Sequence, residues 1–114
     1  MNIVDPRIVS SNVTSRRADY ELVVPEELYY LQGHFPDRPV LPGVVQIHWA
    51  VELAKRSLGL VGAFKGIEAL KFHRIIKPRT PLGLTLEIAE STGKLLFSFR
   101  SDVGVCSQGR ILFE

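Results

Sequence analysis

The chain has 114 residues, 46% of them apolar, and a formal net charge of +2 at pH 7. A chain of this size and composition predicts one small domain over residues 1–114 and excludes a disordered or fibrous protein. Because 14 Lys and Arg residues stand against 12 Asp and Glu residues, the positive charge is too small to indicate binding to nucleic acid.

The sequence shows no sign of a membrane span or a signal peptide, and it has a single cysteine. No stretch approaches the roughly 20 apolar residues that a membrane span requires, and residues 1–7 lack the apolar run of a signal peptide. We therefore expect a cytoplasmic protein without a membrane span. The single cysteine, Cys106, excludes an internal disulfide and a cysteine-based metal cluster, and we expect it to be a small apolar residue of a strand.

The N-terminal part of the chain predicts two strands followed by a loop. Residues 7–24 are rich in Val, Ser and Thr, with apolar residues between polar neighbours, which is typical of two strands joined by a turn. Pro25 ends this pattern. Residues 26–41 mix aromatic residues with Gly and Pro, so we expect a loop with at most one short helical turn.

A helix is predicted from Pro42 to Leu58. Apolar side chains recur three and four residues apart, which places them on one helical face: Val44, Ile47, Val51, Ala54 and Leu58. Pro42 suits the first turn, and Gly59 suits the residue that ends the helix. The polar residues form a narrow opposite sector, bordered by Val45 and Trp49: His48, Glu52, Lys55 and Arg56. We therefore expect a long helix, about 25 Å at 1.5 Å per residue, that is mostly buried.

Four strands are predicted after the helix, at residues 67–72, 82–89, 94–101 and 105–113. Turn-like sequences at 91–93 and 102–104 indicate that the last strands form an antiparallel meander. The expected fold class is α+β, an antiparallel sheet of about five to six strands wrapped around one long central helix. One small sheet cannot enclose such a helix, so leftover apolar surface and free strand edges favour a two-fold dimer.

The loop before the helix combines a histidine with regularly spaced prolines. In GHFPDRPVLPG, residues 33–43, every third position from 36 is proline, which restricts each preceding residue to extended geometry and makes the loop stiff. A stiff loop can hold the imidazole of His34 near the helix start with little loss of entropy. The N–H groups of Gly43 and Val44 have no earlier helical carbonyl to bind, and such donors can hold a thioester oxygen as it gains charge.

The segment HFPDRPVLPGVVQI, residues 34–47, resembles a family signature, HFPGxPxxPGVLxxE. This is the signature of the hot-dog fold 3-hydroxyacyl-[acyl-carrier-protein] dehydratases, and the chain is most similar to those of the aryl polyene type. KFHRIIKPRTPLGLTLEI and VCSQGRILF resemble later blocks of the same family, so the resemblance covers residues 19–113. It implies a hot-dog domain that eliminates water from a 3-hydroxyacyl thioester on acyl carrier protein and leaves a trans-2-enoyl thioester.

The resemblance also implies roles for individual residues. His34 matches the catalytic histidine, which removes a proton from C2 of the acyl chain. Gly43 matches the glycine whose amide binds the thioester carbonyl, with Val44 beside it. His48 stands where the family carries Glu or Asp, the acid that expels the 3-hydroxyl. In dimers of this family the histidine and the acid come from different subunits.

The histidine at position 48 leaves three readings open. His48 donates the proton itself, since an imidazolium is an acid at neutral pH. Alternatively, Glu52, one turn along the helix, orients His48 or supplies the carboxylate. In the third reading the site is silent. The alternative functions are accordingly a hot-dog acyl thioesterase and a silent subunit that pairs with an active dehydratase.

Basic residues gather within LKFHRIIKPR, residues 70–79: Lys71, Arg74, Lys77 and Arg79. Taken alone, this stretch is typical of a solvated strand face and loop. In a dehydratase it implies a basic rim, joined by Arg38, that attracts an acidic acyl carrier protein. We expect no cofactor and no metal, because a zinc site from His34, His48 and His73 lacks close ligand spacing and a supporting cysteine.

Overall fold

Six strands and one helix make up the described part of the chain. The structure, a computed structural model, describes residues 3–28 and 39–114. In chain order the elements are β1 (Arg7–Val13), β2 (Arg17–Val23), α1 (Gly43–Leu58), β3 (Phe64–Phe72), β4 (Pro81–Ile88), β5 (Leu95–Ser101) and β6 (Gly104–Phe113). This order confirms the predicted one, and the largest difference is that β3 begins at Phe64 rather than at residue 67.

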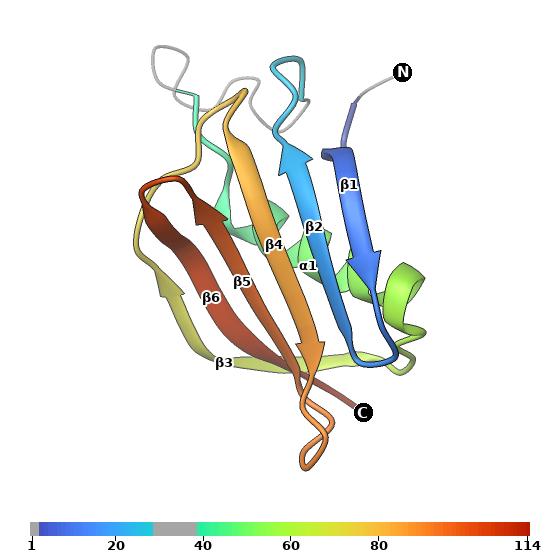
Figure 1. Cartoon of the computed structure of the whole chain (residues 1–114). Helices are drawn as coiled ribbons and strands as arrows, with labels where there is room; N and C mark the ends of the chain where they lie inside the picture. The colour runs from blue at the N-terminus through green and yellow to red at the C-terminus, as the bar shows by residue number, and fades with distance from the viewer. Residues whose placement is uncertain (1–2, 29–38) are drawn as a thin grey trace.

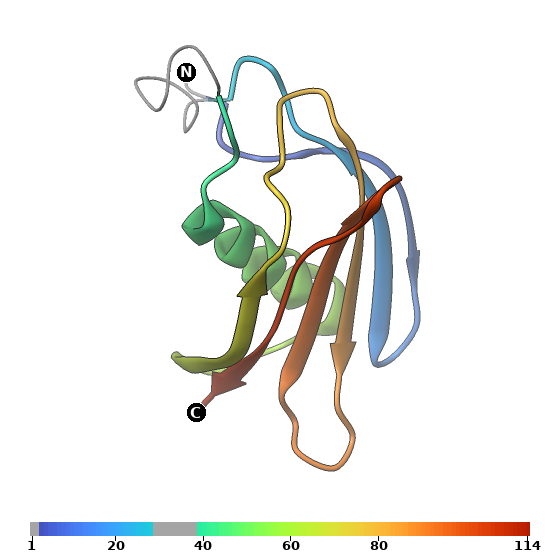
Figure 2. The same cartoon turned by 90° about the vertical axis from the view of Figure 1, so that its left-hand side faces the viewer.

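All six strands belong to one antiparallel sheet. Their order is β1-β2-β4-β5-β6-β3, so β4, β5 and β6 form the predicted meander and β3 joins the outer edge of β6 (Figure 1). The helix α1 lies against one face of this curved sheet (Figure 2). The expected α+β class, an antiparallel sheet with one helix packed on it, is therefore confirmed.

The helix is of ordinary length rather than long. α1 has 16 residues, about 24 Å at 1.5 Å per residue, which agrees with the predicted length of about 25 Å, although a helix of this size is not long for a globular protein. Pro42 precedes the helix in extended conformation (φ −61°, ψ 146°), and Gly59 ends it in the left-handed conformation (φ 64°) that glycine adopts without strain. Within residues 3–28 and 39–114, the structure has no helix with the length and apolarity needed to cross a membrane.

The buried face of α1 differs from the predicted one. The side chains covered by the sheet are Val45, Gln46, Trp49, Ala50, Val51, Leu53 and Ala54. Val44, expected on the buried face, is 73% exposed, whereas Trp49, expected at the border of the polar sector, is 1% exposed. The apolar residues cover more than half of the helix, so their spacing could not decide which part of that surface the sheet covers.

The sheet supplies the other half of the core through alternating residues. In β4, Leu84 and Leu86 are fully buried, whereas Thr85 between them is only partly buried. In β5, Phe97 and Phe99 are buried and meet edge to face with their ring centroids 6.1 Å apart. Cys106, expected in a strand, lies in β6 as predicted, and the structure shows that it is buried.

Among residues 3–28 and 39–114, no further strand pairs with the outer edges of β1 and β3. Every residue of β1 is exposed, and β3, at the opposite edge, is partly buried at most. Large apolar side chains remain on the surface at both ends of β3, where Phe64 and Phe72 are about half exposed. Free edges and apolar surface of this kind are as expected for a chain that pairs with a further subunit.

On the outer face of the sheet, polar side chains pair across strands. The Nε of Arg17 donates to Asp19 Oδ2 (2.9 Å), and the hydroxyl of Thr85 donates to Asp19 Oδ1 (2.9 Å). The hydrogen bond from Arg17 is the main reason why the pKa of the Asp19 carboxyl lies below its usual value. Arg100 in turn donates to Thr85 Oγ1 (3.0 Å), which extends the network over β2, β4 and β5.

Replacing Asp19 by Asn should lower the free energy of unfolding at pH 7 by less than about 1 kcal/mol, because the Arg17–Asp19 pair is partly exposed. The folded-state pKa of Asp19 is lowered, so its stabilisation is complete above the unfolded-state pKa of about 3.9 and is lost as the pH falls through the lower folded-state value. When the free energy of unfolding is measured with denaturant across this pH range, the values for the variant and the wild type should converge in acid. The free energy of unfolding of Arg17→Met should converge with that of the wild type in the same way. A difference that stays constant with pH would contradict the stabilisation by the Arg17–Asp19 pair.

Candidate active site

The residues singled out in the sequence fall into three groups in the structure. His34 and Arg38, together with the rest of residues 29–38, lie outside the described residues. Gly43, Val44, His48 and Glu52 are on α1. Lys71 lies near the end of β3, and Arg74, Lys77 and Arg79 follow in the connection to β4.

A groove opens at the N-terminal end of α1. It has a volume of about 340 Å³, and its walls are the chain segment entering the helix and the segment leaving β3. The lining residues are Val40, Leu41, Pro42, Gly43, Gln46, Phe72, His73, Arg74 and Ile75. The predicted oxyanion residue Gly43 therefore lies in a groove, beside part of the predicted basic rim.

Gly43 is required by the close approach of an aromatic ring. A Cβ atom added at Gly43 would lie 2.5 Å from Cζ and 2.9 Å from Cε1 of Phe72. The ring of Phe72 is half exposed, so a larger residue at position 43 would push it outward rather than disrupt the core. The glycine thus allows the ring of Phe72 to pack directly against the first helical turn, where it forms an apolar wall of the groove.

The first helical turn presents free backbone donors. The carbonyl of Pro42 accepts from the N–H groups of Val45 (3.1 Å) and Gln46 (3.2 Å), so helical hydrogen bonding begins there. Within residues 3–28 and 39–114, the N–H groups of Gly43 and Val44 have no backbone acceptor. Together with the helix dipole, these donors favour negative charge at this end of the groove.

His48 and Glu52 do not line this groove. His48 is exposed and follows Val44 by one turn, so both lie on the side of α1 that the sheet leaves open. Glu52 is partly buried and lines a separate small depression with Asp5 and Arg56. One protomer therefore brings Gly43 into the groove but leaves His48 facing outward.

The basic residues after β3 differ in their surroundings. Lys71, Arg74, Lys77 and Arg79 are all exposed, as is His73 at the groove. Arg79 is neutralised, because its Nε donates to Glu26 Oε2 (3.0 Å). Within the described ranges, the other three make no ion pair. Arg74 lines the groove, whereas Lys71 stands opposite Gln108 in β6, on the other face of the sheet.

Two site residues escaped the sequence analysis. Gln46 and Ser107 are the buried polar side chains of the described part of the chain; they are hydrogen-bonded to each other, and Gln46 lines the groove. A glutamine within an apolar stretch was the available signal for the first. Ser107 had none, because a serine in a half-buried strand is unremarkable in sequence.

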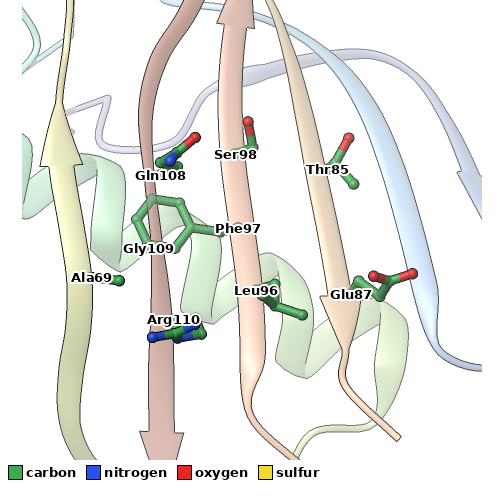
Figure 3. Close-up of a pocket in the computed structure, with 9 residues that line it drawn as sticks. All are labelled: Ala69, Thr85, Glu87, Leu96, Phe97, Ser98, Gln108, Gly109 and Arg110. Atoms are coloured by element: carbon green, nitrogen blue, oxygen red, sulfur yellow. The ribbon is translucent and has the colours of Figure 1, made fainter.

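A second depression lies on the opposite face of the sheet. It has a volume of about 310 Å³ and is lined by side chains of four strands, with α1 behind them (Figure 3). Its polar residues include Thr85, Glu87 and Gln108, but no histidine. Within the described residues, no three His, Cys, Asp or Glu side chains come together as metal ligands. The groove at α1 is therefore the candidate active site.

Known relatives of the chain are dehydratases. The chain is 38% identical to the 3-hydroxyacyl-[acyl-carrier-protein] dehydratase FabZ of Clostridium novyi over 68% of this chain and 59% of that protein. It is 33% identical to the FabZ of Novosphingobium aromaticivorans over 86% of this chain and 68% of that protein. The chain thus spans about half to two thirds of the length of these curated relatives.

A solved structure agrees with these relatives. The dehydratase heterocomplex ApeI:P from Xenorhabdus doucetiae superposes with a TM-score of 0.87 at 31% identity, covering 94% of this chain and 96% of that chain. The family described as ApeI dehydratase matches residues 10–110. Since that match takes in most of the chain, this protein belongs to the ApeI-like dehydratase family, within the hot-dog 3-hydroxyacyl-[acyl-carrier-protein] dehydratases whose signature residues 34–47 resemble.

Proposed function

We propose that this protein is a cytoplasmic dehydratase that removes water from a 3-hydroxyacyl thioester on acyl carrier protein. The observation that carries the proposal is the first turn of α1, where the amides of Gly43 and Val44, within the histidine-containing signature, have no backbone acceptor among the described residues and Gly43 lines a groove. Free amides at a helix N-terminus stabilise an oxygen that becomes negative during reaction. The carbonyl oxygen of a thioester becomes negative in this way when a proton is removed from C2.

The reaction needs a base, an oxyanion site and an acid. His34 is the proposed base, which takes the C2 proton while the thioester oxygen gains charge at the Gly43 and Val44 amides. The electrons of the C2–H bond then form the C2–C3 double bond, and the 3-hydroxyl leaves with a proton as water. Proton removal and proton donation balance, so the elimination consumes no cofactor.

His48 is the proposed acid, and it acts on the site of a second subunit. Its side chain lies on the open side of α1, beside the exposed Val44, and does not line the groove of its own protomer. An imidazolium can donate a proton near neutral pH. Glu52, four residues further along the helix, is the proposed neighbour that orients it.

The second subunit is proposed to pair at the β3 edge. This edge is uncovered, and the exposed Phe64 and Phe72 lie at its two ends. Adding a strand of another subunit would satisfy the free backbone groups and cover these rings. A homodimer, a larger homo-oligomer and a pair with another hot-dog subunit all use this edge.

The carrier protein is proposed to bind over the groove mouth. Arg74 lines the groove, Lys77 follows it in the connection to β4, and Lys71 lies near the end of β3; within the described residues none of the three is ion-paired, whereas Arg79 is already paired with Glu26. Arg38, outside the described residues, is proposed to belong to the same rim. Positive rims accelerate the association of acidic partners and lose this effect at high salt.

Purified protein given a 3-hydroxyacyl carrier substrate should form the enoyl thioester, measured by mass spectrometry of the carrier. His34→Ala and His48→Ala should each lower kcat by about 10²- to 10⁴-fold, the usual contribution of acid or base catalysis. His48→Glu should retain more activity than His48→Ala, because a carboxyl can also donate a proton. Lys55→Ala, in the last turn of α1, is the matched control and should behave as wild type. Full activity of His34→Ala would refute the mechanism.

Reversing the charge of the basic rim should weaken carrier recognition alone. Changing Lys71, Arg74 and Lys77 together to Glu should raise the KM for the carrier substrate about tenfold, equivalent to about 1.4 kcal/mol, as three partly exposed charge interactions would supply. The KM for the same acyl group on a short pantetheine thioester should stay constant. Lys55→Glu controls for reversing a charge at a site outside the rim, and equal effects on both substrates would argue against carrier docking.

A second candidate function is a silent partner subunit. The histidine at the acid position favours it, and the structural relative from Xenorhabdus doucetiae is itself a heterocomplex. In that case the purified chain alone should not turn over, while coexpression with a second hot-dog dehydratase should give a stable complex by size-exclusion chromatography. Activity of that complex should then survive His34→Ala in this chain. Turnover by the isolated chain would exclude this candidate.

A further inference from the structure

Two buried polar side chains connect the helix start to strand β6. Gln46, in the first turn of α1, is 3% exposed, and Ser107, in β6, is fully buried. The hydroxyl of Ser107 donates to Gln46 Oε1 (2.6 Å), and Nε2 of Gln46 donates to the carbonyl of Leu41 (3.2 Å). Ser107 is 61 positions from Gln46 in the sequence, and Gln46 is 5 positions from Leu41.

The direction of this network follows from its last acceptor. A backbone carbonyl can only accept, so Leu41 requires the NH₂ end of the Gln46 amide. The Oε1 end then faces β6, where the single hydrogen of the Ser107 hydroxyl is donated to it. A flipped amide would place two acceptors against each other at Leu41, which is unfavourable in a buried site.

Strand β6 holds both walls of the groove through adjacent residues. The carbonyl of Cys106 accepts from the N–H groups of His73 (2.8 Å) and Arg74 (3.1 Å), which line one wall. Ser107, the next residue, holds the opposite wall through Gln46 and Leu41. The two walls also meet directly, because Leu41 donates its N–H to the carbonyl of Ile76 (2.7 Å).

Leu41 is consequently fixed at both of its backbone groups, two residues before Gly43. Its side chain is 3% exposed, and the rigid Pro42 follows in extended conformation before the helix begins. Only Pro42 stands between Leu41 and Gly43; its ring fixes φ, and its carbonyl is held by the N–H groups of Val45 and Gln46. A shift at Leu41 therefore moves these amides against the opposite wall.

We propose that Gln46 is a positioning residue, which acts with Ser107 to set the Gly43 and Val44 amides relative to the groove. The inference rests on the proposed dehydratase function, and it adds a residue that touches no reacting atom. Misplacement of oxyanion donors lowers the rate of the chemical step more than it lowers affinity. Gln46→Leu should therefore lower kcat about 10- to 100-fold and change KM by less than about twofold.

The pH dependence of kcat in Gln46→Glu distinguishes a positioning role from a purely structural one. An ionised carboxylate can accept from Ser107 but cannot donate to Leu41, whereas a protonated carboxyl can do both. The kcat of this variant should fall as the pH rises, relative to wild type, while the loss in Gln46→Leu should not depend on pH. The other titratable or charged groups described around the groove are His73, Arg74 and the buried Cys106, and the comparison with wild type removes their contribution.

The matched control is Gln108→Leu. Gln108 follows Ser107 in β6, but its side chain lies on the opposite face of the sheet, in the depression of Figure 3. This variant should keep the kcat and the pH profile of wild type. Ser107→Ala should reproduce the kcat defect of Gln46→Leu in weaker form, because the amide of Gln46 can still reach Leu41.

An activity-independent measurement separates this inference from the proposed function. In ¹H–¹⁵N spectra, the Gly43 and Val44 amides should shift in Gln46→Leu and Ser107→Ala but not in Gln108→Leu. If wild type does not dehydrate the substrate, the proposed function fails, and these shifts still decide whether Gln46 positions the amides. Unchanged amide resonances, or a Gln46→Leu variant with wild-type kcat and lowered Tm, would overturn the positioning role.

Discussion

The packing of α1 against one face of the sheet decides where every described site residue lies. The helix buries a stripe centred on Trp49 and Leu53, and this fixes its rotation about its own axis. That rotation turns Val44 and His48 toward the open side and turns Gln46 toward β6. A rotation by one residue position would exchange these environments, so the hydrophobic core and the site depend on the same contact.

The sheet covers only one side of the helix, and the groove of one protomer likewise holds only part of the proposed catalytic groups. The groove of one protomer offers backbone donors at Gly43 and an apolar wall at Phe72, but the imidazole of His48 faces away from it. Among the described residues, β3 pairs only with β6, so its outer edge has no partner strand. The proposed pairing at the β3 edge addresses both features, because one additional subunit would cover apolar surface and contribute its own His48, and it therefore couples association to the proposed activity.

Charge is distributed unevenly despite the small net value. On the outer face of the sheet, Arg17 pairs with Asp19, and Lys94 and Arg110 pair with Glu68, whose carboxyl pKa is lowered chiefly by the hydrogen bond from Lys94. These pairs cancel much of the charge there. Arg74, which lines the groove, and Lys77 have no such ion-pair partner among the described residues, so their charge is not cancelled in this way.

The sequence by itself determined the order of the elements, the meander of β4 to β6, the end of the helix at Gly59 and the place of Gly43 at its start. These features depend on local signals, namely periodicity, turn residues and a contiguous signature, which neighbouring residues carry together. His34 belongs to the same signature and stays a prediction, because it lies outside the described residues.

Only the tertiary structure decided which face of α1 is buried, that Phe72 packs over Gly43, and that Ser107 orients Gln46. The apolar residues surround more than half of the helix, so several rotations were compatible with their spacing. The bond between Gln46 and Ser107 joins residues 61 positions apart. Such a contact depends on how α1 and β6 meet in space, and neither local sequence contains that information.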